Sequence, residues 1–268
     1  MKRVYLEICN ACNLDCPFCS NPKGQSYLSL EEINDYLDQI RPFCSYIYLH
    51  ILGEPLMHPD FDMILHLLDE KQMYLQLVTN GTLLKDHPDI IDHPCLRKLS
   101  ISLHSVNSIS IGPDYFKTID RLIEKDTETL IELRFFDRGN LNDQLKNYLA
   151  DLKKRYEFME TSRSNSYRLK DHLYVLFEDL FRWPSINDPF ISDEGTSHGG
   201  IDMIAINSSS EVTLCCLDPY AYNSIGNLKE KKLKEILESE RYQLICRQIK
   251  EHKLSCELCQ KCSYRLRF

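Results

Sequence analysis

The side chains in this chain that are best suited to chemistry are its cysteines. Twelve cysteines occur among 268 residues. Ten of them fall in two groups, one near each end of the chain: Cys9, Cys12, Cys16 and Cys19, and Cys215, Cys216, Cys246, Cys256, Cys259 and Cys262. Met1-Lys2-Arg3 leads directly into a strand-like segment, so we expect no signal peptide and a cytoplasmic location. Cytoplasmic thiols stay reduced, and a dense set of cysteines there indicates metal binding in place of disulfides. The sequence therefore predicts two metal sites.

Three cysteines of the first group share one short loop after the first predicted strand, Cys12-Asn-Leu-Asp-Cys16-Pro-Phe-Cys19. Three thiolates can hold three irons of a cubane cluster and leave the fourth iron without a protein ligand. An open coordination position is typical of a reactive metal centre. Cys9 leaves an alternative open, because a fourth thiolate would close a zinc site or an electron-transfer cluster. However, Cys9 lies in the predicted strand itself, where a cysteine commonly behaves as a small buried hydrophobic residue.

The second group has the spacing of a metal-binding segment, Cys256-x2-Cys259-x2-Cys262. A further pair, Cys215-Cys216, lies on the second strand of a predicted hairpin. Ligands from a hairpin and from a terminal turn would tie a small module around one metal. A zinc site with the same four-ligand geometry is the alternative. Cys246 lies on an apolar helical face, and we expect it in the core.

Composition and charge argue against several other classes of protein. Hydrophobic residues make up 43% and charged residues 27% of the chain, as in ordinary soluble globular proteins. The formal net charge is −8, from 32 basic and 40 acidic residues, which gives no support to a nucleic-acid or membrane partner. No apolar run approaches the roughly 20 residues that a membrane-spanning helix needs.

Short apolar runs alternate with helical patterns up to about residue 180. Six strands are predicted, at residues 4–8, 46–49, 74–78, 99–103, 130–135 and 173–177. A capping box at Ser29-Leu30-Glu31-Glu32 begins one helix, and Pro59-Asp60 begins another whose apolar face is Phe61, Ile64, Leu67 and Leu68. Weaker helical patterns cover residues 115–123 and 145–152. This alternation predicts an α/β fold with a parallel sheet, and six repeats in place of eight suit a partial (β/α)6 TIM-like barrel.

The pattern changes after Trp183-Pro184. Residues 185–202 are rich in Asp, Ser, Pro and Gly and read as a loop. A hairpin with strands at 203–206 and 212–214 follows, and then helical stretches near 229–249. We therefore predict two domains, a core domain of residues 1–185 and a small Cys-rich α+β domain of residues 186–268.

The Cys-x3-Cys-x-aromatic-Cys loop, with Phe18 as its aromatic residue, resembles the signature of the radical S-adenosylmethionine (SAM) superfamily. Supporting elements follow in the order typical of the family. Gly53-Glu54-Pro55 after the second predicted strand is similar to the element that receives the SAM amino group. The third strand ends in Thr79-Asn80-Gly81. The resemblance covers roughly residues 4–180 and implies a partial (β/α)6 barrel.

The resemblance also implies a cofactor and a set of contacts. Cys12, Cys16 and Cys19 would hold a [4Fe–4S] cluster, whose open iron SAM chelates. The fourth and fifth strands carry a serine and an arginine where the family often binds SAM. The implied SAM-binding residues are Phe18, Gly53, Glu54, Pro55, Asn80, Ser102, His104 and Arg134. Such an enzyme cleaves SAM reductively to a 5′-deoxyadenosyl radical, which abstracts hydrogen from substrate.

The C-terminal cysteines resemble the auxiliary-cluster module called SPASM, or its shorter twitch variant. The resemblance implies a second [4Fe–4S] cluster, with candidate ligands Cys215, Cys216, Cys256, Cys259 and Cys262. The sequence departs from the family at Ser197-His198, where a first cysteine ligand is usual. We expect Cys256 to fill that position, with His198 as second choice and joint ligation by Cys215 and Cys216 as a third.

The resulting hypothesis is a radical SAM enzyme acting on a peptide or a small molecule, with flavodoxin or ferredoxin as electron donor. The alternative is a non-catalytic iron–sulfur or zinc protein that carries electrons or acts as a scaffold. No residue pattern singles out a catalytic side chain, a substrate or an oligomeric state, or indicates whether SAM is consumed or regenerated.

Overall fold

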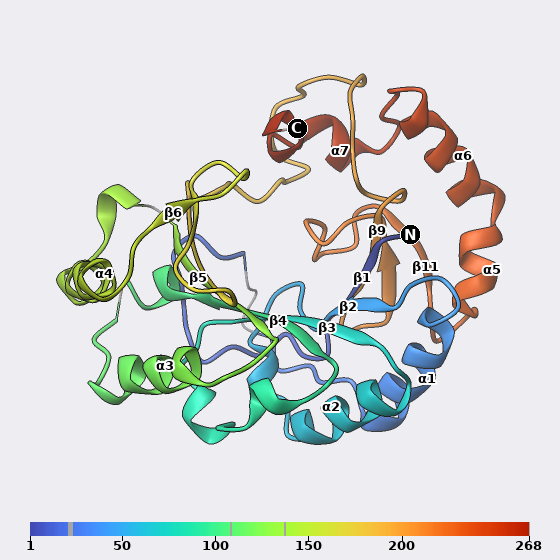
Figure 1. The fold of residues 1–268 in the computed structure, drawn as a ribbon. Helices are drawn as coiled ribbons and strands as arrows, with labels where there is room; N and C mark the ends of the chain where they lie inside the picture. The colour runs from blue at the N-terminus through green and yellow to red at the C-terminus, as the bar shows by residue number, and fades with distance from the viewer. Residues whose placement is uncertain (21–23, 108, 137, 268) are drawn as a thin grey trace. The chain divides into compact units, whose positions relative to one another are not determined.

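The computed structural model describes residues 1–20, 24–107, 109–136 and 138–267 (Figure 1). The chain divides into two compact units. We call the first the terminal unit, which comprises residues 1–12, 18–73 and 181–268. The second, the central unit, comprises residues 13–17 and 74–180. The predicted division into domains 1–185 and 186–268 stays a prediction.

The terminal unit contains five strands in the order β11-β10-β9-β1-β2. Their bounds are β1 Arg3–Leu6, β2 Tyr46–Tyr48, β9 Met203–Ile206, β10 Glu211–Thr213 and β11 Ser224–Asn227. β1 pairs in parallel with β2 and with β9, whereas β9, β10 and β11 pair antiparallel. The register places Tyr5 between Tyr48 and Ala205. Hence the N-terminal strand and the C-terminal hairpin belong to one sheet, although about 200 residues separate them in the sequence.

Helices of the terminal unit follow their predicted signals closely. Their bounds are α1 Leu30–Ile40, η1 Pro55–Met57, α2 Phe61–Glu70, α5 Leu233–Glu238, α6 Glu240–Lys250, α7 Glu257–Lys261 and η6 Tyr264–Arg267. The capping box of α1 is confirmed, because Ser29 and Glu32 bond each other's backbone N–H groups. On α2 the buried face is Phe61, Ile64, Leu65 and Leu68. The prediction of Leu67 was wrong, because Leu67 is only partly buried and Leu65, four residues after Phe61, takes its place on the buried face.

The central unit contains six strands in the order β3-β4-β5-β8-β7-β6. β3 (Tyr74–Thr79), β4 (Leu96–Ser102), β5 (Leu130–Phe136) and β8 (Leu173–Glu178) are parallel. β7 (Ser166–Arg168) and β6 (Met159–Glu160) add an antiparallel edge that the sequence did not predict. Helical segments alternate with the strands: η2 Leu84–Asp86, η3 Ile90–Asp92, η4 Leu103–Val106, α3 Asp114–Glu124, η5 Arg138–Asn140 and α4 Asp143–Arg155.

The predicted fold class is confirmed, because all six predicted strands form and most strand pairs are parallel. The predicted hairpin is also present as β9 and β10, and β11 extends it. The prediction that Cys215 and Cys216 lie on its second strand was wrong, because β10 ends at Thr213. The helical stretch near 229–249 is two helices, since Ser239 ends α5 and caps α6. In the part of the chain that the structure describes, no helix is long and apolar enough to cross a membrane.

Candidate functional site

The three-cysteine loop begins at the end of β1 and belongs to both units, with Cys12 and Cys19 in the terminal unit and Cys16 in the central unit. The Cys19 side chain is exposed, and Cys12 and Cys16 are partly exposed. Within the central unit, the Cys16 thiol donates to the Ser105 carbonyl at 3.5 Å. All three predicted ligands are therefore accessible, as a cluster that must receive a small molecule requires.

Cys9 differs from these three cysteines in its burial. It is buried, with 1% of its surface exposed, and its thiol donates to the Glu54 carbonyl at 3.3 Å. Burial, with the nearby carboxylates of Glu54 and Glu7, raises the pKa of Cys9 to about 12. Iron binds the thiolate form, so this buried and protonated thiol fits a core residue and not a fourth ligand.

The Gly53-Glu54-Pro55 turn is built against the start of the cysteine loop. Gly53 has φ +76°, and a Cβ atom there would lie 2.5 Å from the Cys9 carbonyl oxygen. The Glu54 N–H donates to the Ala11 carbonyl at 2.8 Å. The Glu54 carboxylate is buried and accepts the Leu56 N–H at 3.2 Å, which caps η1. Only glycine allows this close approach, and the turn and loop therefore hold each other in place.

Asn80 is bound to the cysteine loop within the central unit. Its Nδ2 donates to Asn13 Oδ1 at 2.9 Å, and Asn13 Nδ2 donates to Thr82 Oγ1 at 2.7 Å. The Asn80 side chain also accepts the Thr82 N–H at 2.9 Å. Asn80 thus anchors the segment between Cys12 and Cys16, and its predicted contact with SAM stays a prediction. The sequence analysis missed Asn13, although its place between two ligand cysteines was a signal.

The register of β4 and β5 brings two predicted SAM contacts together, because Ser102 lies opposite Arg134. His104 follows in η4, and its ring stacks on Phe136 with 4.4 Å between the ring centroids. The His104 Nδ1 atom lies 3.4 Å from the Arg134 carbonyl oxygen. Ser102, His104 and Arg134 therefore gather at the carboxyl ends of two neighbouring parallel strands, where α/β proteins commonly bind ligands.

Glu132 is a buried carboxylate that holds Arg134, and the sequence analysis missed it. Arg134 Nε donates to Glu132 Oε1 at 2.7 Å, and Lys98 Nζ donates to Oε2 at 2.7 Å. The Ser100 hydroxyl donates to Oε1 at 3.2 Å. Burial opposes the charge on Glu132, but Arg134 and Lys98 outweigh burial and hold the pKa at about 2. Glu132 lies two residues before Arg134 in β5. Residues two apart share one face of a strand, so the sequence could have indicated that Glu132 lies beside Arg134.

Replacing Glu132 by Gln should destabilise the chain by roughly 3 kcal/mol at pH 7, because two partly buried cations lose their buried counterion. The pKa of Glu132 lies below its ordinary value of 4.5, so its contribution is fully present above pH 4.5 and is lost as the pH falls toward 2. Urea unfolding followed by circular dichroism measures both effects. Glu128→Gln, at an exposed position, is the control. An equal, small effect of both substitutions would contradict the assignment.

Part of the second cysteine group lines a cavity in the terminal unit with an empty volume of about 390 Å³. Cys215, Cys259 and Cys262 line it. Cys256 caps the N-terminus of α7, and Cys262 caps its C-terminus, so helical spacing places Cys256, Cys259 and Cys262 along one side. The Leu217 N–H donates to Cys215 Sγ at 3.4 Å, and Asn223 Nδ2 donates to Cys259 Sγ at 3.7 Å.

These thiols influence one another electrostatically. A hydrogen bond to Cys256 raises the pKa of Cys259 well above its usual value, and burial, Cys215 and Cys262 raise it further. Burial raises the pKa of Cys262, and Cys215 adds to that effect. Three thiols line the cavity, a fourth, Cys256, is hydrogen-bonded to Cys259, and two of the four accept N–H groups; four such thiols are the donor set of an iron–sulfur cluster. The residues present therefore fit the cluster that the sequence implies.

Cys216 and His198, the other candidate ligands, are not among the residues that line this cavity. Cys216 packs with Tyr5 and Trp183 against an apolar cluster of Ile51, Leu52 and Ala205, and it hydrogen-bonds with Tyr5 and Cys215. His198 Nδ1 lies 2.7 Å from Asp202 Oδ2. The geometry favours Cys215, Cys256, Cys259 and Cys262 as the ligand set, which stays a prediction.

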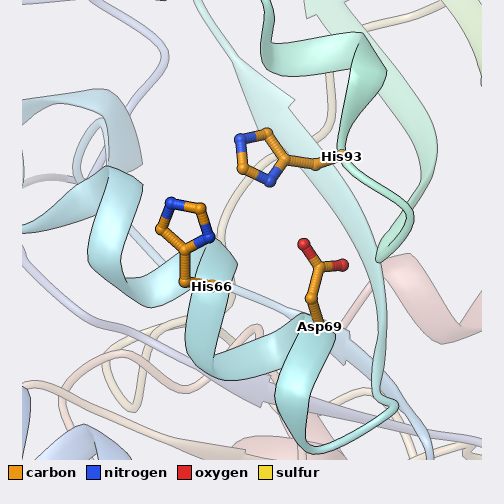
Figure 2. Close-up of side chains that lie close together, drawn as sticks. All are labelled: His66, Asp69 and His93. Atoms are coloured by element: carbon orange, nitrogen blue, oxygen red, sulfur yellow. The ribbon is translucent and has the colours of Figure 1, made fainter.

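Among the described residues outside both cysteine groups, His66, Asp69 and His93 have side chains of metal-binding types. Figure 2 shows His66 and Asp69, which project from α2 three residues apart, together with His93 of the central unit. A helical separation of three residues places His66 and Asp69 on one side of α2. We assign these side chains no part in the candidate site.

A mostly parallel α/β scaffold, an accessible three-cysteine loop and a cavity lined by three further thiols are the features of an iron–sulfur protein. Two family models match the chain: the radical SAM superfamily over residues 6–133, and the SPASM iron–sulfur cluster-binding domain over residues 198–263. The chain belongs to the radical SAM superfamily and carries a SPASM domain. It is therefore an enzyme that uses a [4Fe–4S] cluster with SAM and an auxiliary iron–sulfur cluster.

Individual relatives agree with this family. GTP 3′,8-cyclase from Aquifex aeolicus is 22% identical, and the match spans 94% of each chain. Among solved structures, BtrN in complex with AdoMet and 2-DOIA has a TM-score of 0.59 and 14% identity, covering 97% of this chain and 92% of BtrN. anSMEcpe with bound AdoMet and the Cp18Cys peptide has a TM-score of 0.60 and 14% identity, and the match covers 98% of this chain and 86% of anSMEcpe. At this identity, the structures support the fold.

Proposed function

We propose that this enzyme abstracts a hydrogen atom from a peptide or small-molecule substrate, using a SAM-binding cluster on Cys12, Cys16 and Cys19. The observation that carries the proposal is the difference between these three accessible thiols and the buried Cys9. With three cysteine ligands, one iron is left for SAM. The bound cluster and SAM together supply a 5′-deoxyadenosyl radical, and the chain's own residues bind and orient the reactants.

The residues around the loop have separate tasks in this proposal. The turn at Gly53–Pro55 receives the amino group of SAM, at a position fixed by its contacts with Cys9 and Ala11. Arg134 contacts the SAM carboxylate or ribose. Glu132 accepts from its Nε and so orients the guanidinium, and among the described residues no other side chain bonds its remaining N–H groups, which can therefore meet a ligand. Ser102 and His104 contribute further polar contacts, and Phe18 shields the cluster.

The substrate class is proposed from the relatives. One structure of similar fold holds a peptide and another holds 2-DOIA, in each case together with AdoMet. We infer that this chain takes a substrate of one of these two kinds, and that a flavodoxin or a ferredoxin supplies the electron. The auxiliary cluster would then serve electron transfer or contact the substrate.

The test is anaerobic reconstitution with iron and sulfide, followed by dithionite and SAM. We expect release of 5′-deoxyadenosine. Candidate peptides and small molecules labelled with deuterium then test the abstraction, because the label should appear in the 5′-deoxyadenosine that forms. A protein that assembles both clusters and yields no 5′-deoxyadenosine would overturn the proposal and favour an electron carrier. A colourless protein that holds zinc would exclude iron–sulfur chemistry altogether.

A further inference from the structure

Arg265 is a buried cation in the wall of the auxiliary cavity. It lies in η6, only three residues after Cys262, and 7% of its surface is exposed. The same cavity is lined by the thiols of Cys215, Cys259 and Cys262. A guanidinium group stays charged at every pH that a protein encounters. A permanent positive charge is therefore built into the shell around the second metal site.

Backbone carbonyl groups hold this guanidinium in place. Nε donates to the carbonyl of Cys259, Nη1 to that of Glu194 and Nη2 to that of Ser192, each at 3.1 Å. Gly195 makes room for the group, because a Cβ atom at that position would overlap Nη1. Each of the three nitrogens is fixed by a neutral acceptor. Arg265 therefore has a defined position, set by the loop that contains Ser192 and Glu194 on one side and by α7 on the other.

Its charge has no counterion among the residues that the structure describes. Among the described residues, no carboxylate lies within the 4.0 Å of an ion pair with Arg265. Asp218 is the carboxylate that lines the same cavity, and its oxygens accept the N–H groups of Tyr222 and Asn223 at 2.9 and 2.7 Å. A buried charge without a partner is costly. A cluster bound by four thiolates carries net negative charge and would supply the missing partner.

We propose that Arg265 is the counter-charge of the auxiliary cluster and raises its reduction potential. Adding an electron makes a cluster more negative, so a fixed positive charge beside it stabilises the reduced form more than the oxidised form. The residue acts through the cluster and touches no substrate, which makes it a positioning residue. The inference rests on the auxiliary cluster and is independent of the proposed substrate.

The experiment uses the full chain with Cys12, Cys16 and Cys19 replaced by Ala, so that the auxiliary cluster can be observed alone. A redox titration followed by electron paramagnetic resonance gives its midpoint potential. We expect R265Q to lower the potential enough to change the ratio of reduced to oxidised cluster at least tenfold, which is 59 mV for one electron. R265K, which keeps the charge, should stay close to the unsubstituted value.

Arg267→Gln is the matched control, because it removes one charge two residues away at an exposed position, where water screens it. Equal potentials for R265Q and the unsubstituted protein would overturn the proposal, and so would equal shifts for R265Q and R265K. If R265Q fails to assemble a cluster, R265K provides the test. An R265K variant that holds iron at the original potential supports the role of the charge. An R265K variant that also loses iron shows a structural role for Arg265 and overturns the proposal. If the variant with Cys12, Cys16 and Cys19 replaced by Ala still held two clusters, the assignment of these cysteines as ligands of the SAM-binding cluster would be wrong. The comparison of the Arg265 variants would still be valid.

Discussion

Replacing Cys12, Cys16 or Cys19 by Ala is expected to reduce 5′-deoxyadenosine release to the level of protein without iron. Each substitution removes one of three protein ligands, and a cubane held by two thiolates is lost or no longer binds SAM productively. Because the auxiliary ligands are untouched, iron should fall from about eight to about four atoms per chain. Iron analysis and chromatography of the reaction products measure the two effects.

Cys9→Ala is the control for this series. Its thiol is buried and bonded to the Glu54 carbonyl, so its loss should cost stability and leave the iron content unchanged. The opposite pattern, in which Cys9→Ala removes the SAM-binding cluster, would mean four cysteine ligands around that centre. Such a centre has no position for SAM, and the proposed function would then fail.

The second large effect is expected at the auxiliary cavity. Cys215→Ala and Cys259→Ala should each remove the auxiliary cluster, because both thiols line the cavity and each influences the thiols around it. Iron should again fall by about half, with the SAM-binding cluster and its electron paramagnetic resonance signal with SAM retained. The adjacent Cys216→Ala should keep the full iron content.

The pair Cys215→Ala and Cys216→Ala is a stringent comparison, since the two residues are neighbours in the sequence. Cys216 packs with Tyr5 against Ala205 and Leu52, so its replacement should lower stability modestly. Iron loss in the Cys216 variant that equals the loss in the Cys215 variant would indicate that both thiols ligate. If a His198→Ala variant instead lost the iron of the auxiliary cluster, His198 would be the fourth ligand.

Much of the fold could be predicted because local patterns carried it. The capping box of α1 and the apolar runs of the six strands specify their elements through short-range hydrogen bonds and periodic burial. The edge hairpin of β6 and β7 escaped prediction because its strands are two and three residues long. Pairing with β8 supplies its order, and that pairing has no local signature.

The sequence by itself determined the family and the three-cysteine loop, because close spacing brings the thiols together whatever the rest of the chain does. It left open which of Cys215 and Cys216 faces the cavity. Both residues follow the end of β10 at Thr213, and only tertiary packing, which places Cys216 beside Tyr5 and Cys215 in the cavity wall, decides which thiol meets the metal. Glu132 and Arg265 gained their roles in the same way. Their partners are Arg134 and the carbonyls of Ser192 and Glu194, and long-range packing alone converts these ordinary charged residues into buried ones.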